Sequence, residues 1–576
     1  MSLLPFGNLP VYQPRTLVPE AIDLGNWESV GPLFDELERR LADCSSTDEL
    51  SAWIRDGGEV SAAIDEAGTR RYIAMTCHTD DADAERAYLE FVEKVEPQIK
   101  PRQFQLAKLF LEHPCRRDLS PDRYEVFDRD TALSVELFRE ENVPLETEES
   151  KLGQQYQKLS GSLTVRFRNE EKTLVQMGVF LEETDRSVRE AAWRLVASRR
   201  LAEKDNFEQQ FEEMLVIREK IAANAGFENY RDYMFRKLGR FDYGPADCEK
   251  FHEAVETVIV PALKGLQAKR KEQLGVDQLR PWDMSVDPLG RPPLKPFAEV
   301  EEMVQRTQQI FDKLDPELGG GFGKMRELKL LDLDNRKGKA PGGYQSTLSE
   351  ARLPFIFMNA VGVQRDVETM LHEAGHAFHA LATQDEEVYS YRHAPMEFCE
   401  VASMAMELLG NEFLEEFYPG EEADRARRSH LEGILTILAW IAIVDAFQHW
   451  IYTHPGHSRA DRTAKWVELM DRFGADVDWA GFAEEKANLW HRQLHIFLCP
   501  FYYIEYGIAQ LGALQVWANS RQDGPKALAD YKAGLALGGS RPLPELFQRA
   551  GCRFQFDADI FKPLVALVDA ELDRLN

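Results

Sequence analysis

The sequence predicts a mostly α-helical protein with one small β-sheet, and three observations support this fold class. Charged and apolar residues alternate at helical spacing over residues 27–55, 82–113 and 187–223. Short apolar runs between residues 328 and 360 have the length and composition of strands. A chain of 576 residues, 44% of them hydrophobic, can bury a large core without disulfides.

Two further segments break the helical pattern. Residues 160–180 alternate like a pair of strands around Asn169, and the proline cluster in residues 278–300 is typical of a surface loop.

The run Gly319–Lys324 (GGGFGK) invites comparison with a phosphate-binding loop. A Walker loop, however, needs glycine at the position that Leu318 occupies and serine or threonine at the position that Met325 occupies. We therefore expect a flexible turn there.

Three strand candidates make up the small sheet: LKLLDLD, the turn and strand in RKGKAPGGYQSTL, and LPFIFMNA. Pro354 suits the start of a strand or an edge strand, because proline cannot donate to a central ladder. An edge strand can bind an extended peptide as an added strand. The pair Gly342-Gly343 either lets the backbone approach a ligand closely or forms a plain hairpin turn.

Charge and cysteine content argue against several classes of partner. The chain has 98 acidic and 69 basic residues, and its formal net charge of -29 opposes binding to nucleic acids or anionic membranes.

Seven scattered cysteines without a CxxC pair indicate reduced thiols in a cytoplasmic compartment. No signal peptide is evident, and the longest apolar stretch, Ile434–Val444, is about half of the roughly 20 residues that cross a bilayer. We expect a cytoplasmic protein that buries this stretch as a helix.

The segment His372-Glu373-Ala374-Gly375-His376 is an HExxH motif. Residues four apart share a helix face, so both imidazoles can reach one metal ion while Glu373 flanks it. Gly375 costs about 1 kcal/mol of helix stability relative to alanine, which close packing, for example against substrate backbone, would explain. The apolar residues of this helix form a stripe on the opposite face: Val367, Met370, Leu371, Ala374, Phe378, Leu381 and Ala382. This separation favours a metal site over a buried structural histidine.

A catalytic zinc site takes three protein ligands, so the third must come from another element. The candidate is Glu400 in the helical segment EFCEVASMAMELL, where acidic residues stand among apolar neighbours and need partners. Glu407 lies two turns later on the same face and is a candidate for supporting a ligand histidine. A solvated surface charge is the alternative for both acids.

HEAGHAFH followed by EVASMAME resembles the thimet oligopeptidase and oligoendopeptidase F family of zinc metallopeptidases. GKAPGGYQSTL and LPFIFMN resemble the family's substrate-binding strand and loop. The resemblance extends from about residue 200 to the C-terminus and is nearer to oligoendopeptidase F and Pz peptidase than to the thimet branch. It implies that His372, His376 and Glu400 hold one Zn²⁺ per chain. The family pattern HExGHxxH and ExxSxxxE is matched by His372, Glu373, Gly375, His376, His379, Glu400, Ser403 and Glu407.

The resemblance also implies a catalytic role for a tyrosine-rich segment. In the family a histidine precedes tyrosines whose hydroxyls face the scissile carbonyl, and here these residues are His495, Tyr502 and Tyr506. Tyr502 and Tyr506 are four apart, so one helix face can carry both hydroxyls. Residue chemistry alone favours an aromatic packing stripe, and only the resemblance points to catalysis.

The fold and activity that the resemblance implies follow from these segments. It implies a two-lobed helical body around a deep substrate channel, with an N-terminal helical lobe in residues 1–200 and a catalytic domain in residues 201–576. The implied activity is a zinc-dependent endopeptidase that cuts short oligopeptides, with Glu373 as general base. The alternatives are a zinc exopeptidase of the dipeptidyl carboxypeptidase kind and a non-catalytic helical peptide-binding protein, against which the intact Glu373 argues. We expect oligopeptide substrates, no nucleic-acid or membrane partner, and a monomer, although no sequence feature defines the oligomeric state.

Overall fold

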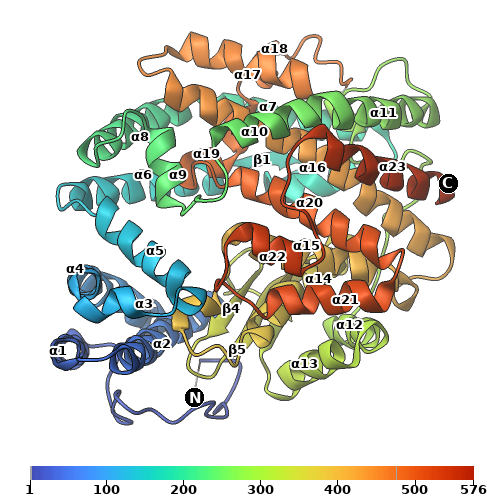
Figure 1. Ribbon diagram of the computed structural model, residues 1–576. Coiled ribbons are helices and arrows are strands. Elements are labelled where there is room, and N and C mark those ends of the chain that lie inside the picture. Colours follow the sequence, from blue (N-terminus) through green and yellow to red (C-terminus); the bar gives the residue numbers. More distant parts are fainter. Residues whose placement is uncertain (1–2, 475, 576) are drawn as a thin grey trace. The chain divides into compact units, whose positions relative to one another are not determined.

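A computed structural model describes residues 3–474 and 476–575 of the chain (Figure 1). By its packing, the chain divides into two compact units, and each is discontinuous in sequence. Unit 1 comprises the N-terminal part up to Glu136 together with Lys295–Arg427 and Gly512–Phe554. Unit 2 comprises Leu137–Leu294, Arg428–Leu511 and the C-terminal part from Gln555. The predicted division of the sequence at residue 200 stays a prediction.

Helices make up 68% of the structure, which confirms the mostly α fold class. Unit 1 contains α1 (Trp27–Asp43), α2 (Thr47–Cys77), α3 (Ala82–Lys94), α4 (Glu96–Glu112), α12 (Val300–Leu314), α13 (Pro316–Glu327), β3 (Leu331–Asp334), β4 (Tyr344–Leu348), β5 (Leu353–Ala360), α14 (Gln364–Ala382), α15 (Met396–Asn411), α21 (Gly524–Leu535) and α22 (Leu543–Arg549). Unit 2 contains α6 (Asn142–Ser162), β1 (Thr164–Phe167), β2 (Glu170–Thr173), α7 (Arg186–Leu201), α8 (Lys204–Asn224), α9 (Tyr230–Lys237), α10 (Pro245–Ala254), α11 (Val260–Leu274), α17 (Arg459–Phe473), α18 (Ala483–Ala487), α19 (Leu494–Leu498) and α23 (Ala558–Arg574). Helices α5 (Pro121–Leu137), α16 (Glu421–Thr453) and α20 (Tyr503–Ser520) contribute residues to both units.

The predicted helical segments are present, but each is divided into two helices. Ser46 caps α2 by accepting a hydrogen bond from the backbone N–H of Glu49, which separates α2 from α1. Asp81 caps α3 in the same way, by accepting hydrogen bonds from the backbone N–H groups of Asp83 and Ala84. The helix expected over residues 82–113 is interrupted at Val95, because Pro97 in the first turn of α4 favours a new helix start.

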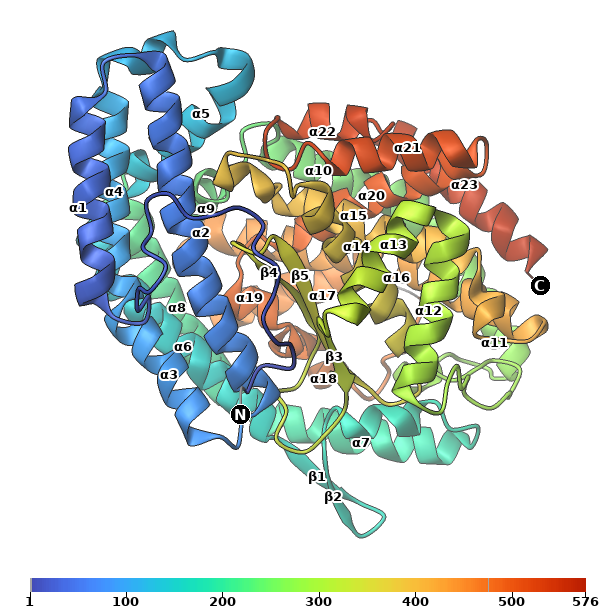
Figure 2. The ribbon, with the colours of Figure 1, turned by 90° about the horizontal axis from the view of Figure 1, so that it is seen from below.

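Apolar faces of α1, α2 and α4 form a shared core in unit 1, where Figure 2 shows these helices running side by side. Trp53 of α2 stacks on Phe110 of α4 with ring centroids 6.0 Å apart. The indole N–H of Trp53 donates to the carbonyl of Leu37 in α1 at 2.8 Å, so its one polar atom is satisfied inside the core.

A three-stranded sheet lies beside these helices in unit 1, with strand order β3-β5-β4 (Figure 2). Strand β5 runs parallel to β3 and antiparallel to β4, so it is the central strand. Pro354 is its second residue and is paired with Thr347 of β4, whereas pairing with β3 begins only at Ile356. Proline therefore sits at the start of a strand, as predicted, and the edge-strand alternative for this segment is wrong.

The expected flexible turn at residues 319–324 is wrong, because this run lies inside helix α13. Asp315 accepts hydrogen bonds from two first-turn N–H groups, and Pro316 occupies the first helical position. A Cβ added at Gly319 would lie 3.0 Å from the Cα of Asp312 in α12. One added at Gly321 would lie 3.0 Å from Leu381 in α14. The glycines thus let α13 approach two other helices closely, which local turn propensity does not reveal.

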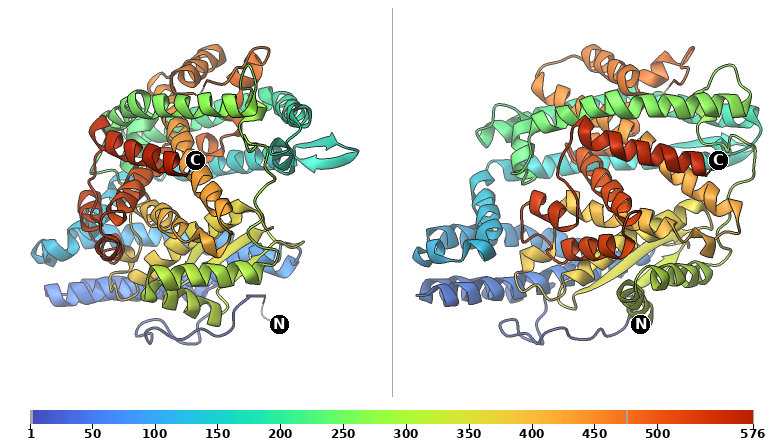
Figure 3. Two further views of the ribbon diagram at one scale, coloured as in Figure 1. Left: turned by 90° about the vertical axis from the view of Figure 1, so that its right-hand side faces the viewer. Right: turned by 45° about the vertical axis from the view of Figure 1, so that its right-hand side comes forward.

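The strand pair predicted in residues 160–180 is a hairpin of β1 and β2 in unit 2, and Figure 3 shows it projecting beyond α7. Its turn places Arg168 and Asn169 at φ values of 50° and 67°. Asparagine tolerates this left-handed region better than most residues, which favours the turn at this point.

Helix α16 is the one helix in the described residues that is long and apolar enough to cross a membrane. In the structure, 72% of its most apolar window is buried within the protein. The stretch Ile434–Val444 lies inside this helix, and Leu435, Leu438 and Ile441 have no exposed surface. The prediction that this stretch forms a buried helix is confirmed.

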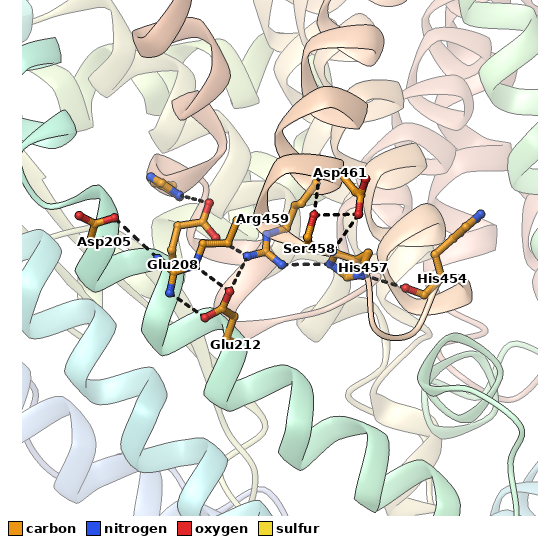
Figure 4. A network of polar contacts seen from close by, with 10 residues as sticks. Asp205, Glu208, Glu212, His454, His457, Ser458, Arg459 and Asp461 are labelled. Atoms are coloured by element: carbon orange, nitrogen blue, oxygen red, sulfur yellow. Dashed lines mark hydrogen bonds and ion pairs between the residues drawn. The ribbon is translucent and has the colours of Figure 1, made fainter.

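Ion pairs join α8 to α17 within unit 2 (Figure 4). Arg459 binds both carboxylate oxygens of Glu212 at 2.7 Å. Arg462, whose side chain is 1% exposed, pairs with Glu208, and the second oxygen of Glu208 lies 3.3 Å from Nε2 of His491. Both oxygens of this buried carboxylate therefore have partners, as buried charges require.

Candidate metal centre

Helix α14 presents the HExxH motif on a face that is separate from its core face. Its first turn is fixed by Asp366, which accepts hydrogen bonds from the three backbone N–H groups of residues 361–363 at 2.8–3.0 Å. The predicted apolar stripe is buried at Val367, Met370, Leu371, Ala374 and Phe378. By contrast, the side chains of His372 and His376 keep 24% and 19% of their surface exposed.

Gly375 explains how closely α15 approaches α14. A Cβ on this residue would lie 2.6 Å from the carbonyl oxygen of Ala402 and 2.6 Å from the Cα of Ser403. The close packing expected at Gly375 is thus with the backbone of α15. The same carbonyl of Ala402 accepts a hydrogen bond from Tyr531 in α21 at 2.7 Å, which holds α15 from its other side.

This packing brings the three predicted metal ligands together. One side-chain donor atom from each of His372, His376 and Glu400 lies within 4.8 Å of the others. Oε2 of Glu400 is 3.5 Å from Nε2 of His372 and 3.7 Å from Nε2 of His376. Two imidazole nitrogens and one carboxylate oxygen are a donor set that catalytic zinc uses, leaving a position for water. The residues therefore fit the metal that the sequence predicted.

Further contacts orient these side chains. Oε1 of Glu407 is 2.7 Å from Nδ1 of His372, which is the predicted contact between Glu407 and a ligand histidine. Burial lowers the pKa of His372, but the hydrogen bond and charge of Glu407 outweigh it and raise this pKa to about 9. Burial and the neighbouring His372 lower the pKa of His376 to about 3, so its imidazole is neutral. The hydroxyl of Ser403 donates to Oε2 of Glu400 at 3.0 Å.

Glu373 is a buried carboxyl group beside this donor set, with 7% of its surface exposed. Burial raises its pKa and the charge of Glu400 adds to this, whereas the charge of His372 and a backbone hydrogen bond from Gln345 lower it, and the net pKa is about 7. A carboxyl group with a pKa near neutrality can both accept and release a proton at physiological pH.

His379 lies one turn after His376 but outside the group of converging donors. It is 5% exposed, its ring centroid is 5.9 Å from that of Phe398, and its Nε2 has no hydrogen-bond partner among the described residues. Burial lowers its pKa to about 4. His379 therefore packs as a neutral ring behind the site.

The predicted tyrosine segment belongs to unit 2 and forms a cluster there. The ring centroid of His495 lies 6.0 Å from that of Tyr502 and 5.9 Å from that of Tyr506, and the two tyrosines are 5.1 Å apart. Helix α20 begins at Tyr503, so Tyr502 stands just before it and does not share a helix face with Tyr506. Phe501 before them has φ 66°, and its N–H donates to Gln448 at 2.6 Å, which fixes this turn.

One contributor to the site was missed in the sequence. Strand β4 lies at an edge of the sheet and packs against α14, where the N–H of Gln345 meets the Glu373 carboxyl group. The residues of YQSTL predict a strand. Its position beside the motif, however, depends on the antiparallel pairing of β4 with β5 and on the packing of both strands against α14. No local signal identifies Gln345.

Comparisons with known proteins place these segments in a family. The model described as "Peptidase family M3" matches residues 179–565, and that described as "Peptidase M3 N-terminal domain" matches residues 23–138. The chain is similar to the structure of Pz peptidase A solved with an inhibitor, with 28% identity and a TM-score of 0.88 over 97% of this chain and 99% of that chain. It is 24% identical to oligopeptidase PepF of Bacillus subtilis (strain 168) over 316 residues, which are 53% of this chain and 45% of the relative.

The fold is also shared more distantly. Oligoendopeptidase F from Enterococcus faecium superposes with a TM-score of 0.63 at 16% identity, over 95% of this chain and 97% of that chain. The first curated relatives are matched over less than half of their own length, 45% for PepF and 41% for the plasmid oligoendopeptidase F of Lactococcus lactis subsp. cremoris. The first family model, in contrast, spans more than half of this chain. The protein therefore belongs to peptidase family M3.

Proposed function

We propose that this protein is a zinc-dependent endopeptidase that hydrolyses internal bonds of short oligopeptides in the cytoplasm, as a monomer. The observation that carries the proposal is the convergence of His372, His376 and Glu400 beside a buried carboxyl group, Glu373, whose pKa is raised to about 7. The family membership and the similarity to Pz peptidase A support a peptide substrate.

The chain's own side chains prepare the metal site. Glu407 accepts a hydrogen bond from Nδ1–H of His372, which leaves the Nε2 lone pair for the metal. Ser403 donates to one carboxylate oxygen of Glu400 and so fixes its orientation. Bound Zn²⁺ supplies a Lewis acid that polarises the scissile carbonyl and lowers the pKa of water.

Glu373 carries the proton transfers in this proposal. Its carboxylate takes a proton from the attacking water and then delivers it to the leaving amine nitrogen. The N–H of Gln345 holds this carboxyl group in place from strand β4. Because β4 lies at a sheet edge beside α14, an extended peptide can add to this edge through main-chain hydrogen bonds.

Following the family resemblance, the donors to the developing oxyanion in this proposal are Tyr506, Tyr502 and His495. Tyr506 and Tyr502 each carry a hydroxyl that can donate a hydrogen bond, and the ring of His495 lies against both. Burial lowers the pKa of His495 to about 4, so its ring is neutral, and its Nδ1 is already held by Gln493 at 2.8 Å.

The test is cleavage of an internally quenched oligopeptide that is capped at both ends. We expect cleavage that a zinc chelator abolishes and that added zinc restores. Glu373→Gln should remove cleavage while zinc stays bound, since the variant keeps all three metal donors. Glu302→Gln is the matched control, because it removes the same charge from an ion pair with Arg306 on α12 and should leave cleavage unchanged.

Two results would contradict the proposal. Turnover retained in Glu373→Gln would exclude this residue as the base. Cleavage confined to peptides with a free terminus would indicate the exopeptidase, and zinc binding without cleavage of any peptide would indicate the binding protein.

A further inference from the structure

A second group of metal-ligand side chains lies in unit 2, on two helices that carry no part of the HExxH site. Helix α10 bears Cys248 and His252, and α16 bears Asp445 and His449. Each pair is four residues apart and so shares one helix face. The sequence therefore contains CxxxH and DxxxH, two spacings that suit a common ligand.

The donor atoms of three of these residues converge. One atom each from Cys248, Asp445 and His449 lies within 4.8 Å of the other two. Nε2 of His449 is 3.3 Å from Oδ2 of Asp445, and Nε2 of His252 is 2.8 Å from the same oxygen. His252 therefore holds the carboxylate, while the other three side chains face one point.

Burial makes this arrangement costly unless something else binds there. Asp445 is fully buried, and Cys248 and His449 are 2% and 8% exposed. Oδ1 of Asp445 and Nδ1 of His449 have no hydrogen-bond partner among the residues that the structure describes, and Nε2 of His449 has the Asp445 carboxylate at 3.3 Å. A buried polar atom without a partner is strongly unfavourable, and buried charges are normally paired or bind metals.

The ion pairs of unit 2 show what a fully partnered carboxylate looks like. Glu208 has Arg462 on one oxygen and His491 on the other (Figure 4 labels Glu208). Asp445 has only imidazoles for ion-pair partners among the described residues, and one of its oxygens has none. A divalent cation would neutralise a thiolate and a carboxylate together.

A cavity of about 220 Å³ reaches this group, because His252 and His449 both line it. The cavity offers an entry path and room for a bound water. Its basic lining residues do not oppose a cation, since each has an acidic partner. The pairs are Arg231 with Asp232 at 2.9 Å, Lys465 with Glu468 at 2.8 Å and Arg472 with Glu256 at 2.7 Å.

We propose that Cys248, Asp445 and His449 bind a second divalent metal ion, with Zn²⁺ as the best match, and that His252 positions Asp445 for it. A thiolate, an imidazole and a carboxylate are each established zinc ligands, and thiolate disfavours Mg²⁺ and Ca²⁺. The ion joins α10 to α16 inside unit 2, and its role is structural because all three ligand side chains are buried. This inference does not depend on the peptidase activity.

The cobalt spectrum of the full-length protein tests the assignment without any variant. The HExxH ligands include no sulfur, so a thiolate-to-cobalt charge-transfer band in the near ultraviolet can come only from a cysteine site such as this one. We expect the cobalt-loaded protein to show this band and elemental analysis of the zinc form to give about two metal ions per chain.

Variants then assign the band to a residue. Cys248→Ser should lose the band and one metal ion per chain, while the metal at the HExxH site and peptide cleavage remain. Cys552→Ser is the matched control, because this thiol is also buried but lies outside the group, and it should keep the band. A single metal ion with no band in the unmodified protein, or a band that persists in Cys248→Ser, would overturn the proposal.

Discussion

The α14–α15 group in unit 1 and the α10–α16 group in unit 2 use the same construction for different ends. In each, two helices pack so that residues four apart on one helix meet an acid or a thiol from another. The side chains of His372 and His376 remain 24% and 19% exposed, whereas that of Asp445 is 0% exposed and that of His449 is 10% exposed. Exposure lets a substrate reach the first group, while burial suits the second to holding helices together.

The two groups also differ in which residue lies beside the metal-ligand side chains. Glu373 adjoins the first group with a pKa raised to about 7, so a proton acceptor is present. Beside the second group, His252 contacts Asp445 and orients it. A metal site becomes catalytic when an open position and a base accompany it, and it stays structural when the protein closes it.

The largest expected effect separates the two groups by activity. His376→Ala removes a ligand from the first group and should reduce kcat/KM by at least about 1,000-fold, since a catalytic metal supplies several kcal/mol of transition-state stabilisation. Cys248→Ser should keep kcat/KM within about twofold, because a structural metal does not touch the transition state. Equal losses in the two variants, with both folded by circular dichroism, would contradict the division of roles.

The metal-free protein should show opposite pH responses in the two groups. The pKa of Glu373 rises from 4.5 to about 7 on folding, so the native state holds more protons between these pH values and loses stability as pH rises across them. Glu373→Gln cannot ionise. As pH rises through this window, the free energy of unfolding of Glu373→Gln should therefore increase relative to that of the wild type, by about 3 kcal/mol at most. Urea titrations at several pH values measure this difference.

Asp445 provides the contrast in the same experiment. Burial raises its pKa, but the charges of His449 and His252 outweigh burial and hold this pKa below its ordinary range. Its stabilising contribution is present above the ordinary aspartate pKa and is lost as pH falls, so Asp445→Asn should cost most at neutral pH. A stability difference that does not vary with pH in either variant would show that these carboxyl groups titrate normally.

The packing of α15 on α14 should tolerate no side chain at Gly375. Gly375→Ala places a Cβ 2.6 Å from two backbone atoms of α15, and overpacking of this kind costs about 1–3 kcal/mol. Gly320→Ala in α13 is the matched control, since nothing lies within 4 Å of the added Cβ, and helix propensity alone should stabilise it by about 0.5–1 kcal/mol. Denaturant unfolding measures both, and equal stability of the two variants would show that the helices can move apart freely.

The prediction of the first group rests mainly on local information in the sequence. Two histidines and a glutamate stand within one turn of α14, and the opposite apolar stripe shows which face is free. Glu400 lies on a second helix, where its place among apolar neighbours made it a candidate and the resemblance to a known family supported it. Gln345 could not be predicted, because its N–H meets Glu373 only after the chain has passed through β5 and entered α14.

Errors arose where packing between distant helices decided the structure. The glycines of residues 319–324 have the composition of a turn, yet they form α13 because their missing side chains let it approach Asp312 and Leu381. The sequence did not predict that Cys248 and Asp445 lie together, because nothing in either helix indicates that the two will meet. The spacings CxxxH and DxxxH are the only local signals of the second group, and each is weak alone.

The smallest expected effect tests how the first group is held. Glu407 contacts Nδ1 of His372 at 2.7 Å, and partners of this kind change metal affinity by about 10–100-fold. Glu407→Gln keeps an acceptor oxygen but removes the charge, so zinc affinity measured against a competing chelator should fall within that range. Once zinc is saturating, kcat should recover most of its value, because Glu407 acts through the ligand.

Glu412→Gln controls for the loss of charge, since Glu412 pairs with Arg521 at 3.1 Å and contacts no ligand histidine. Unchanged zinc affinity in both variants would mean that α15 positions His372 through packing alone. A loss of kcat at saturating zinc in Glu407→Gln would instead place this carboxylate in the chemistry.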